Sequence, residues 1–274
     1  MKVWPVARAR PSLGLTNPLL RNGYALVLNV GLTAALGVSF WVIAAREYSV
    51  ADVGRGSAMV SALITLSTLG QLNLTTGLLR FLPRAGRHAG TLIRRSYVLG
   101  GIACVALAAA FLLIAPRVAE GFEFLPDSPL MVTGFCAAVL VWSVFALQDA
   151  AITGLRRSVW IPLENGVYGV LKIGVLVLLA EWSPGAGVFA AWVGAAAVIL
   201  VPVNLVIFGR WVPAHAQASL EADSERPNVR QVARLLGVDY LGSVCYLAST
   251  AALPLLVVTE LGPVANGYFY VAWT

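Results

Sequence analysis

The chain has 274 residues, of which 59% are hydrophobic and only 12% are charged, and its formal net charge is +6. Soluble domains have about 45–50% apolar and about 25% charged residues, so this composition excludes a water-soluble globular enzyme. A bilayer can accommodate the excess of apolar surface, and a backbone in lipid must satisfy its own hydrogen bonds, so we expect membrane-spanning helices. A transmembrane barrel would instead show segments of about 10 residues with alternating polarity, and the apolar segments here are longer and apolar on all sides.

The apolar segments predict seven complete spans and the start of an eighth, since one crossing needs about 20 mostly apolar residues. The expected spans are Asn22–Ala45, Ser57–Phe81, Ser96–Ala115, Leu130–Gly154, Val159–Ala180, Val188–Gly209 and Leu235–Val258, and the eighth begins near Ala265. We therefore predict an all-α, polytopic transmembrane helix bundle. The last apolar run has barely begun at Thr274, so we expect the natural protein to continue beyond this residue.

Signals for cleavage, cofactors and catalysis are missing from the sequence. The first apolar stretch has the length of a span and no small-residue cleavage site follows it, unlike a secretory signal peptide. The chain contains no GxGxxG, Walker A or HExxH pattern, so we expect no cofactor and no enzymatic activity. The three cysteines all lie in predicted spans, where apolar packing is favoured over disulfides or a metal site; they are Cys104, Cys136 and Cys245.

The basic residues fall on alternate loops, and this alternation orients the chain. Of the 19 Lys and Arg residues, 15 lie before span one or in the loops after spans two, four and six. The other loops carry only Arg46, Arg55 and Arg117 and are rich in acidic residues. Because Lys and Arg concentrate on the cytoplasmic side, we predict a multi-pass protein of the cell membrane with a cytoplasmic N-terminus. Topology and anionic lipid explain the net charge, so nucleic-acid binding is not expected.

Spans one and seven superimpose when the sequence is shifted by 213 residues, which favours an internal repeat. The matched pairs are Arg21 with Arg234, Glu47 with Glu260, and Gly54 with Gly267. Both copies begin on the predicted cytoplasmic side, so the repeat is parallel, as in a class of transporters. We predict a cytoplasmic N-terminal segment (residues 1–21), a first lobe of six helices (22–209), a cytoplasmic linker (210–234) and the start of a second lobe (235–274).

Charged residues inside spans are candidates for function, because a charge in the bilayer is costly and usually faces a cavity or a partner. The candidates are Asp149, Glu164, Lys172 and Asp239. Asp149 precedes Arg156 by seven residues, and Asp239 lies near Arg234. Pairing with these local arginines is the structural alternative for both acids.

Lys172 is the most informative of these residues. Asn165 precedes it by seven positions on the same helix face, and Glu164 flanks that face. Lys172 lies about 20 Å along the helix from its cytoplasmic end, which is too deep for the ammonium to reach the interface fully. One interpretation is a cationic contact for a lipid phosphate, or a gated ion pair with a neighbouring span. The other is a structural ion pair with Glu164 or Asp149.

Other spans contain polar residues or prolines. Pro202 and Pro254 are expected to bend spans six and seven. Span two is interrupted by residues that either line a cavity or join helices through hydrogen bonds. These residues are Gln71, Asn73, Thr75, Thr76 and Gly77.

Three stretches carry motifs of one known family. Span two ends Gly77-Leu-Leu-Arg80-Phe-Leu-Pro83-Arg84. The link after span four reads Gln148-Asp149-Ala-Ala-Ile-Thr-Gly154-Leu-Arg156-Arg157, and continues to Pro162-Leu-Glu164-Asn165 and Lys172. Span seven leads to Leu261-Gly262-Pro-Val-Ala-Asn-Gly267-Tyr-Phe-Tyr270. With the topology, these stretches resemble polysaccharide-biosynthesis membrane proteins, the lipid-linked oligosaccharide flippases of the multidrug/oligosaccharidyl-lipid/polysaccharide exporter superfamily.

The resemblance implies two lobes of six helices around a cavity that opens to one side at a time. It implies export of an undecaprenyl-diphosphate-linked glycan, with membrane lipids, a polysaccharide polymerase and glycosyltransferases as partners. Such families bind the diphosphate with cationic cavity residues, so Arg80 and Lys172 are the first candidates and Arg21 is a weaker one. The further cavity candidates are Asn73, Asp149, Glu164 and Asn165.

Three other functions stay open. A cation-coupled multidrug exporter of the same superfamily would need acidic residues near the middle of span one, which has only Asn29. A membrane-embedded glycosyltransferase or ligase would need a sizeable non-cytoplasmic loop, but Arg46–Gly56 and Pro116–Pro129 are too short to form a domain. A non-transporting scaffold in a polysaccharide-assembly complex also fits the sequence.

Overall fold

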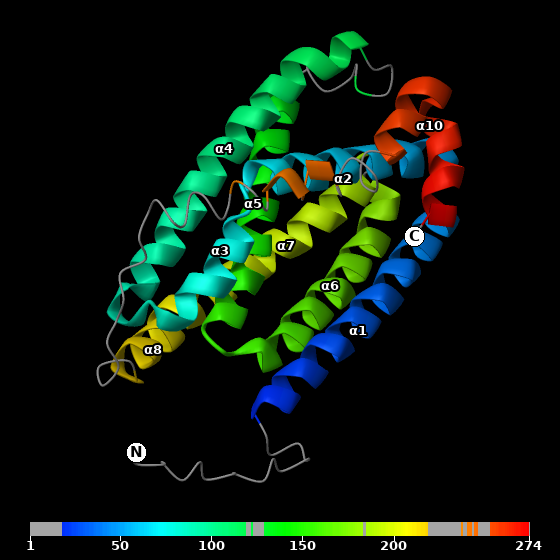
Figure 1. Ribbon diagram of the computed structural model, residues 1–274. Helices are drawn as coiled ribbons and strands as arrows, with labels where there is room; N and C mark the ends of the chain where they lie inside the picture. The colour runs from blue at the N-terminus through cyan, green and yellow to red at the C-terminus, as the bar shows by residue number, and fades with distance from the viewer. Residues whose placement is uncertain are drawn as a thin grey trace, which may run out of the picture.

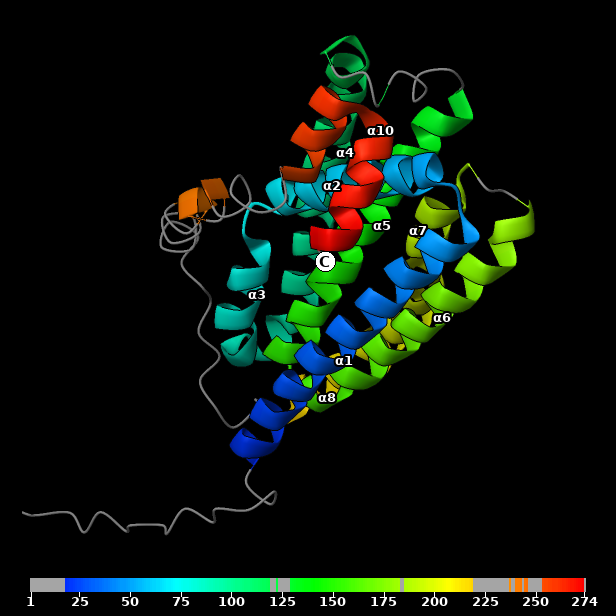
Figure 2. The same cartoon turned by 90° about the vertical axis from the view of Figure 1, so that its right-hand side faces the viewer.

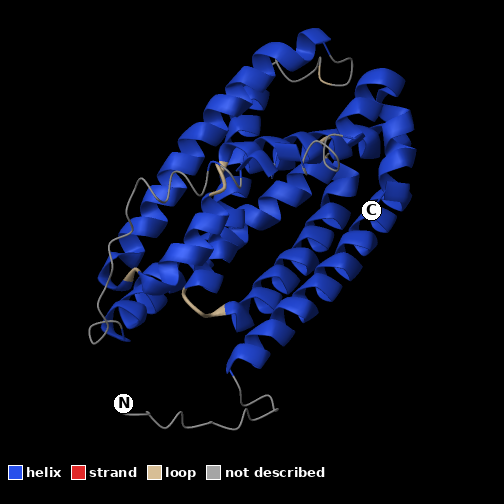
Figure 3. Cartoon of the chain, viewed as in Figure 1, coloured by secondary structure: helices blue, strands red, loops and turns tan. Residues whose placement is uncertain are grey.

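A computed structural model describes residues 18–118, 122, 129–182, 185–218, 237, 240–242, 244–245 and 253–273. Within these residues the regular structure is entirely helical (Figure 3), which confirms the predicted all-α bundle. Five helices are long and apolar enough to cross a membrane, and a bent pair makes a sixth span if it counts as one. The chain therefore has the architecture of a polytopic α-helical membrane protein.

Nine helices and four short turns have described bounds, and the described residues 237, 240–242 and 244–245 are also helical. The helices are α1 (Pro18–Glu47), α2 (Val50–Gly70), α3 (Leu74–Phe81), α4 (Ala89–Val118), α5 (Pro129–Gly154), α6 (Ile161–Trp182), α7 (Gly187–Val206), α8 (Val212–Ala218) and α10 (Leu253–Trp273). The turns are η1 (Leu82–Arg84), η2 (Gly86–His88), η4 (Ser158–Trp160) and the π turn η5 (Ile207–Trp211). Helix α1 packs along α6, α6 along α7, α4 along α5, and α2 against α10 (Figures 1 and 2).

The two ends of the bundle differ in charge. The long helices alternate in direction, so α1, α4 and α6 begin, and α5 and α7 finish, at the same end (Figure 1). We call this the arginine-rich end, because it carries Arg84, Arg94, Arg95, Arg157 and Arg210. The alternation seen in the sequence thus becomes a charge difference between the two ends of the folded bundle.

The second predicted span is broken. Helix α2 begins at Val50 and ends at Gly70, and α3 follows it at an angle of 54° after a break of three residues. In this break Leu72 and Asn73 have positive φ angles of 48° and 59°, a left-handed conformation that cannot continue an α-helix. The expectation of one continuous helix over Ser57–Phe81 is therefore wrong, and the polar residues of this span mark the break.

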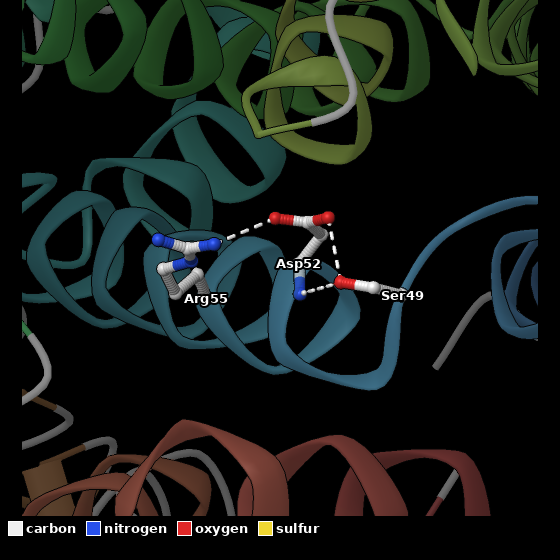
Figure 4. A network of polar contacts seen from close by, with 3 residues as sticks. All are labelled: Ser49, Asp52 and Arg55. Atoms are coloured by element: carbon white, nitrogen blue, oxygen red, sulfur yellow. Dashed lines mark hydrogen bonds and ion pairs between the residues drawn. The ribbon is translucent and has the colours of Figure 1, made fainter. Parts of the chain in front are cut away.

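A local polar cluster fixes the start of α2 (Figure 4). The Ser49 hydroxyl oxygen accepts a hydrogen bond from the Asp52 N–H at 3.1 Å and donates to Asp52 Oδ2 at 2.6 Å. Arg55 Nη2 donates to Asp52 Oδ1 at 2.7 Å, the one ion pair in the described part of the chain. Ser49 is therefore a helix N-cap, and the acid in the first turn also complements the positive helix terminus.

A reciprocal glycine contact joins α2 to α10. A Cβ on Gly54 would overlap the Pro263 carbonyl, and a Cβ on Gly267 would lie 2.6 Å from the Val50 carbonyl oxygen. The shift of 213 residues that pairs Gly54 with Gly267 also pairs Val50 with Pro263. Each helix thus places its glycine against the equivalent carbonyl of the other, as in an interface between two similar units related by a two-fold axis. The two stretches matched by this shift are thus in contact, while the repeat itself stays a prediction.

The sixth span continues beyond its predicted end at Gly209. Pro202 lies inside α7, where it removes a backbone donor, and the π turn Ile207–Trp211 follows. Helix α8 then extends to Ala218, into the segment predicted as a linker. The π turn begins five residues after Pro202, and the expected bend at Pro202 itself stays a prediction. Residues 219–234 of the predicted linker lie outside the described part.

Helix α10 combines the end of predicted span seven with the start of span eight. It is broken at Gly262, whose φ of 81° and ψ of 174° are not helical. Pro254 is the second residue of α10, and residues 246–252 before it lie outside the described part, so the expected bend at Pro254 stays a prediction. Half of the predicted span Leu235–Val258, including Asp239, lies outside the described residues.

Candidate functional site

Helix α6 carries the buried polar residues that the sequence indicated. Glu164, Asn165, Tyr168 and Lys172 are all buried, although they belong to a helix long and apolar enough to span a membrane. Tyr168 and Lys172 follow the adjacent pair Glu164 and Asn165 at intervals of three or four residues, so the four side chains share one side of the helix. The other side is apolar and exposed, as lipid contact requires. Helix α6 thus points its polar side into the bundle.

Aromatic rings enclose the ammonium group of Lys172. The Nζ atom lies 3.8 Å from the ring centroid of Trp192 on α7, 4.7 Å from that of Phe40 on α1, and 5.1 Å from that of Tyr168. All three distances lie within the roughly 6 Å range of cation–π attraction. We call Phe40, Tyr168 and Trp192 the aromatic cage. It stabilises a charged lysine without neutralising it.

A second layer of rings holds the cage in place. Trp192 packs against Trp41 and Trp142, with centroid distances of 5.9 Å to each, and against Phe40 at 5.3 Å. The Tyr168 hydroxyl donates a hydrogen bond to the Trp192 carbonyl oxygen at 3.3 Å. These contacts limit the rotation of the cage rings, so the cage is a defined cation site.

The ion pairs predicted as structural alternatives are not formed. Among the described residues neither Lys172 with Glu164 or Asp149, nor Asp149 with Arg156, approaches within ion-pair distance. Lys172 lies about 12 Å beyond Glu164 along α6, and Arg156 is exposed in a left-handed turn with a φ of 61°. Both pairing predictions are wrong, and the Lys172 charge has no acidic partner in the described part of the protein.

Amide side chains hold the two buried acids nearer the arginine-rich end. Gln148 Nε2 donates to Glu164 Oε1 at 2.6 Å, and Asn204 Nδ2 donates to Gln148 Oε1 at 2.9 Å. Asn165 Nδ2 donates to Asp149 Oδ2 and to Asn29 Oδ1, both at 3.2 Å. These bonds join α1, α5, α6 and α7. We call the set the amide–acid network; its members are Asn29, Gln148, Asp149, Glu164, Asn165 and Asn204.

The network leaves one oxygen of each acid without a partner. Asp149 Oδ1 and Glu164 Oε2 are both buried and accept no hydrogen bond from any described residue. A carboxyl group in this situation gains from taking up a proton or binding a cation. The described residues contain no group of three or more His, Cys, Asp or Glu side chains able to hold a metal ion. A proton or a cation bound partly by amide oxygens therefore fits these acids better.

Two predicted cavity residues lie apart from the cage and the network. Arg80 is exposed on α3, which packs on α4 and α5, and no hydrogen bond, ion pair or ring contact within the described chain joins it to either group. Asn73 lies at the break before α3, where its Oδ1 accepts a hydrogen bond from the Thr76 hydroxyl at 3.3 Å. The side chain of Arg21 lies outside the described part. The structure therefore groups Asp149, Glu164 and Asn165, and places Lys172 further along the same helix.

The sequence reasoning missed the partners of these charges. Gln148 and Asn204 are amides in predicted spans, and this polarity was an available signal. Phe40 gave no signal, since one more apolar residue in an apolar span does not stand out.

Comparison with models of protein families, with curated proteins and with solved structures finds no significant match. The class of the protein is therefore defined by its own architecture. It is a polytopic helical membrane protein with a caged buried cation and two buried acids held by amides.

Proposed function

We propose that this protein is a flippase that moves a lipid-linked oligosaccharide or polysaccharide precursor across the cell membrane by alternating access. The observation that carries the proposal is the buried cation. Lys172 lies about 17 Å along α6 from its start, near the middle of a membrane-spanning helix, and has no acidic partner among the described residues. Ionisable residues at such depth are costly and usually serve transport. The diphosphate of a polyprenyl-linked glycan would supply the missing negative charge.

The aromatic cage suits a cation that must exchange partners. Cation–π contacts contribute about 2 kcal/mol or more when desolvated, whereas hydrogen bonds between charged groups are roughly twice as strong as neutral ones. The rings therefore keep Lys172 charged and in place, and a diphosphate can still displace them. A lysine already bonded to a carboxylate would lose that partner whenever the substrate bound.

The reciprocal contact of Gly54 and Gly267 supports an arrangement of two similar lobes. In this proposal helices α1 to α8 form the first lobe and α10 opens the second. The contact lies at the end of the bundle opposite the arginine-rich end (Figure 1). Rocking of the lobes about it would open a gap at the arginine-rich end, which we propose is cytoplasmic because Lys and Arg concentrate on that side.

The amide–acid network favours a second candidate function, a cation-coupled multidrug exporter. Span one lacks an acid, but the fold places Asp149 against Asn165, and Asn165 against Asn29 of α1. The oxygens of Asp149 and Glu164 that lack partners would serve a coupling proton or cation in such an exporter. The same network would supply coupling in a flippase, so the transported molecule distinguishes the two functions.

The proposed function is tested by glycan export from cells that depend on the full-length protein. Lys172→Ala removes the caged charge and should lower export of the lipid-linked glycan at least about tenfold, while Lys172→Arg should retain part of it, since a charge-assisted contact contributes about 1.5–3 kcal/mol. Arg46→Ala removes an exposed charge at the opposite end and serves as the matched control, with unchanged export expected.

Two outcomes would contradict the proposal. Glycan export by the Lys172→Ala protein at the wild-type rate would show that the caged cation does not handle the substrate. Export of a cationic dye by the wild type, lost in Glu164→Gln and retained in Lys172→Ala, would establish the multidrug exporter instead.

The lobe contact has its own test. Gly54→Ala places a Cβ against the Pro263 carbonyl, and overpacking of this kind destabilises by about 1–3 kcal/mol. Gly37→Ala on α1 is the matched control, because a Cβ there meets nothing within 4 Å and alanine favours the helix by up to about 1 kcal/mol. The midpoint temperature of thermal unfolding of the purified protein should therefore fall for Gly54→Ala. It should stay unchanged or rise for Gly37→Ala. Equal stability of the two variants would exclude a close α2–α10 contact.

A further inference from the structure

A pocket of about 470 Å³ lies between α6 and α7 at the arginine-rich end. Its apolar walls include Leu163 and Val167 of α6 and Val203 and Val206 of α7. The volume lies within the roughly 300–1,000 Å³ of ordinary ligand pockets. None of the three cage residues lines it, so this pocket is separate from the caged lysine.

The pocket opens toward the lipid rather than toward the interior of the bundle. Leu163 is 56% exposed, Val167 46% and Val206 40%, so the apolar walls belong to the outer faces of α6 and α7. In a bilayer such faces contact hydrocarbon chains. The ligand that reaches the pocket from this side is a membrane lipid.

Two arginines stand at the end of the pocket nearest the membrane surface. Arg157 precedes α6, Arg210 lies in the π turn after α7, and both line the pocket and are exposed. Neither forms an ion pair with a described residue. Trp160 and Trp211 lie beside them with ring centroids 5.9 Å apart, which is typical of residues at the level of lipid headgroups. Basic pockets between helices on this side of a membrane suit anionic headgroups.

The inner end of the pocket has the opposite character. Glu164 lines it, and one of its carboxylate oxygens is bonded to Gln148 while the other has no partner in the described part of the protein. Glu164 lies in the first turn of α6, whereas Arg157 precedes the helix. Among the described residues, the only basic side chains that line the pocket are the two arginines at its mouth, so a phosphate is favoured there and not beside the carboxyl group of Glu164.

We propose that this pocket binds one anionic phospholipid of the leaflet at the arginine-rich end. Its phosphate lies between Arg157 and Arg210, and one acyl chain lies along the apolar walls of α6 and α7. The pocket faces lipid, and Lys172 does not line it. A phospholipid therefore fits this pocket better than the transported substrate does. The lipid would hold the ends of α6 and α7 together beside the network residues Glu164 and Asn204. This inference does not depend on the proposed flippase activity.

The test measures lipid retention by the purified full-length protein in native mass spectrometry. The probes are dioleoyl phosphatidylglycerol, dioleoyl phosphatidylcholine and undecaprenyl phosphate. The wild type should retain phosphatidylglycerol at a markedly lower concentration than phosphatidylcholine. Because each basic residue near the surface contributes about 1 kcal/mol, Arg157→Gln with Arg210→Gln should weaken phosphatidylglycerol binding about 30-fold. The pair Arg84→Gln and Arg87→Gln removes the same charge from the same end outside the pocket, and should leave binding unchanged.

Further variants fix the position and identity of the ligand. Glu164→Gln should retain or strengthen phosphatidylglycerol binding, and Lys172→Met should leave it unchanged. The proposal is overturned by equal retention of the two phospholipids, by equal loss in the two arginine pairs, or by weaker binding in Glu164→Gln. Arginine-dependent binding of undecaprenyl phosphate in preference to phosphatidylglycerol would overturn the choice of a phospholipid. If the phospholipid-binding test fails but Lys172→Ala still loses glycan export, the lipid site is overturned and the proposed flippase function stands.

Discussion

Helix α6 buries charge in two different ways. Near the arginine-rich end, Glu164 and the neighbouring Asp149 are held by the amide donors of Gln148 and Asn165. Further along the same helix, Lys172 is held by the faces of three aromatic rings. In the described part of the protein, neither region pairs its charge with an opposite one. The difference is that the acids are bonded by directional donors, while the cation is held by contacts that have little directional preference.

The network therefore fixes the positions of helices, whereas the cage allows the Lys172 ammonium group to exchange its contacts. Amide hydrogen bonds join four helices and fix their packing, because each donor must keep its distance and angle to its acceptor. Aromatic faces attract a cation over a wider range of positions, so Lys172 can shift without breaking a defined bond. We infer that the network positions the helices and that the cage keeps a charge ready for an anionic ligand.

Among variants of the two regions, the largest loss of stability should come from removing the cage ring nearest the Lys172 ammonium group. Trp192→Ala removes the ring 3.8 Å from Lys172 Nζ. Because Trp192 is partly buried, this truncation should cost up to about 3–5 kcal/mol, the range for a fully buried tryptophan. Part of the lost free energy of unfolding should come from the contact with the lysine. In a double-mutant cycle, Trp192→Ala should therefore destabilise the Lys172→Met protein by about 2 kcal/mol less than it destabilises the wild type. Thermal unfolding of the four purified proteins measures this coupling.

Trp142→Ala provides the control for that cycle. Its ring packs against Trp192 at 5.9 Å, but it has no cation–π contact with Lys172 within the described structure. Lys172→Met should therefore leave the cost of Trp142→Ala unchanged. Additive behaviour of Trp192→Ala and Lys172→Met would mean that the rings pack near the lysine without stabilising its charge.

Removing a donor from the amide–acid network should cause a smaller loss of stability. Gln148→Leu removes the donor to Glu164 and leaves both carboxylate oxygens without a partner, which costs about 1–3 kcal/mol. Adding Glu164→Leu should recover much of this loss, because an apolar pair of similar shape needs no partner. The measurement is again thermal unfolding of the purified protein.

Lys172→Met tests whether the two regions are independent. It should leave the cost of Gln148→Leu unchanged, because Lys172 has no hydrogen bond to the network among the residues described. A strong coupling between Lys172 and Gln148 would instead mean that the cage and the network form one electrostatic unit.

The sequence predicted the helices well because long apolar runs have one stable solution in a bilayer. The predicted spans Leu130–Gly154 and Val159–Ala180 match α5 and α6 closely. The break of span two was not predicted, although Gly70, Gln71 and Asn73 lie at it, because such residues also occur in continuous membrane helices and do not specify the left-handed backbone at Leu72 and Asn73.

The sequence identified the charged residues of the candidate site but not the side chains that contact them. Lys172, Glu164 and Asp149 stood out because charge is rare in spans, but their partners lie on other helices. Sequence spacing fixes neighbours on one helix, whereas the rotation of α1 and α7 against α6 decides what faces Lys172. An acid was the natural expectation for its partner, and the fold supplies Phe40 and Trp192 instead.

The central claim is that the caged charge of Lys172 binds the phosphate of the substrate lipid. The most direct measurement is the affinity of the purified full-length protein for undecaprenyl diphosphate, compared between the wild type and Lys172→Met. We expect the affinity to fall about 10- to 100-fold, because a contact between charged groups contributes about 1.5–3 kcal/mol. Equal affinity of the two proteins for undecaprenyl diphosphate would contradict the claim.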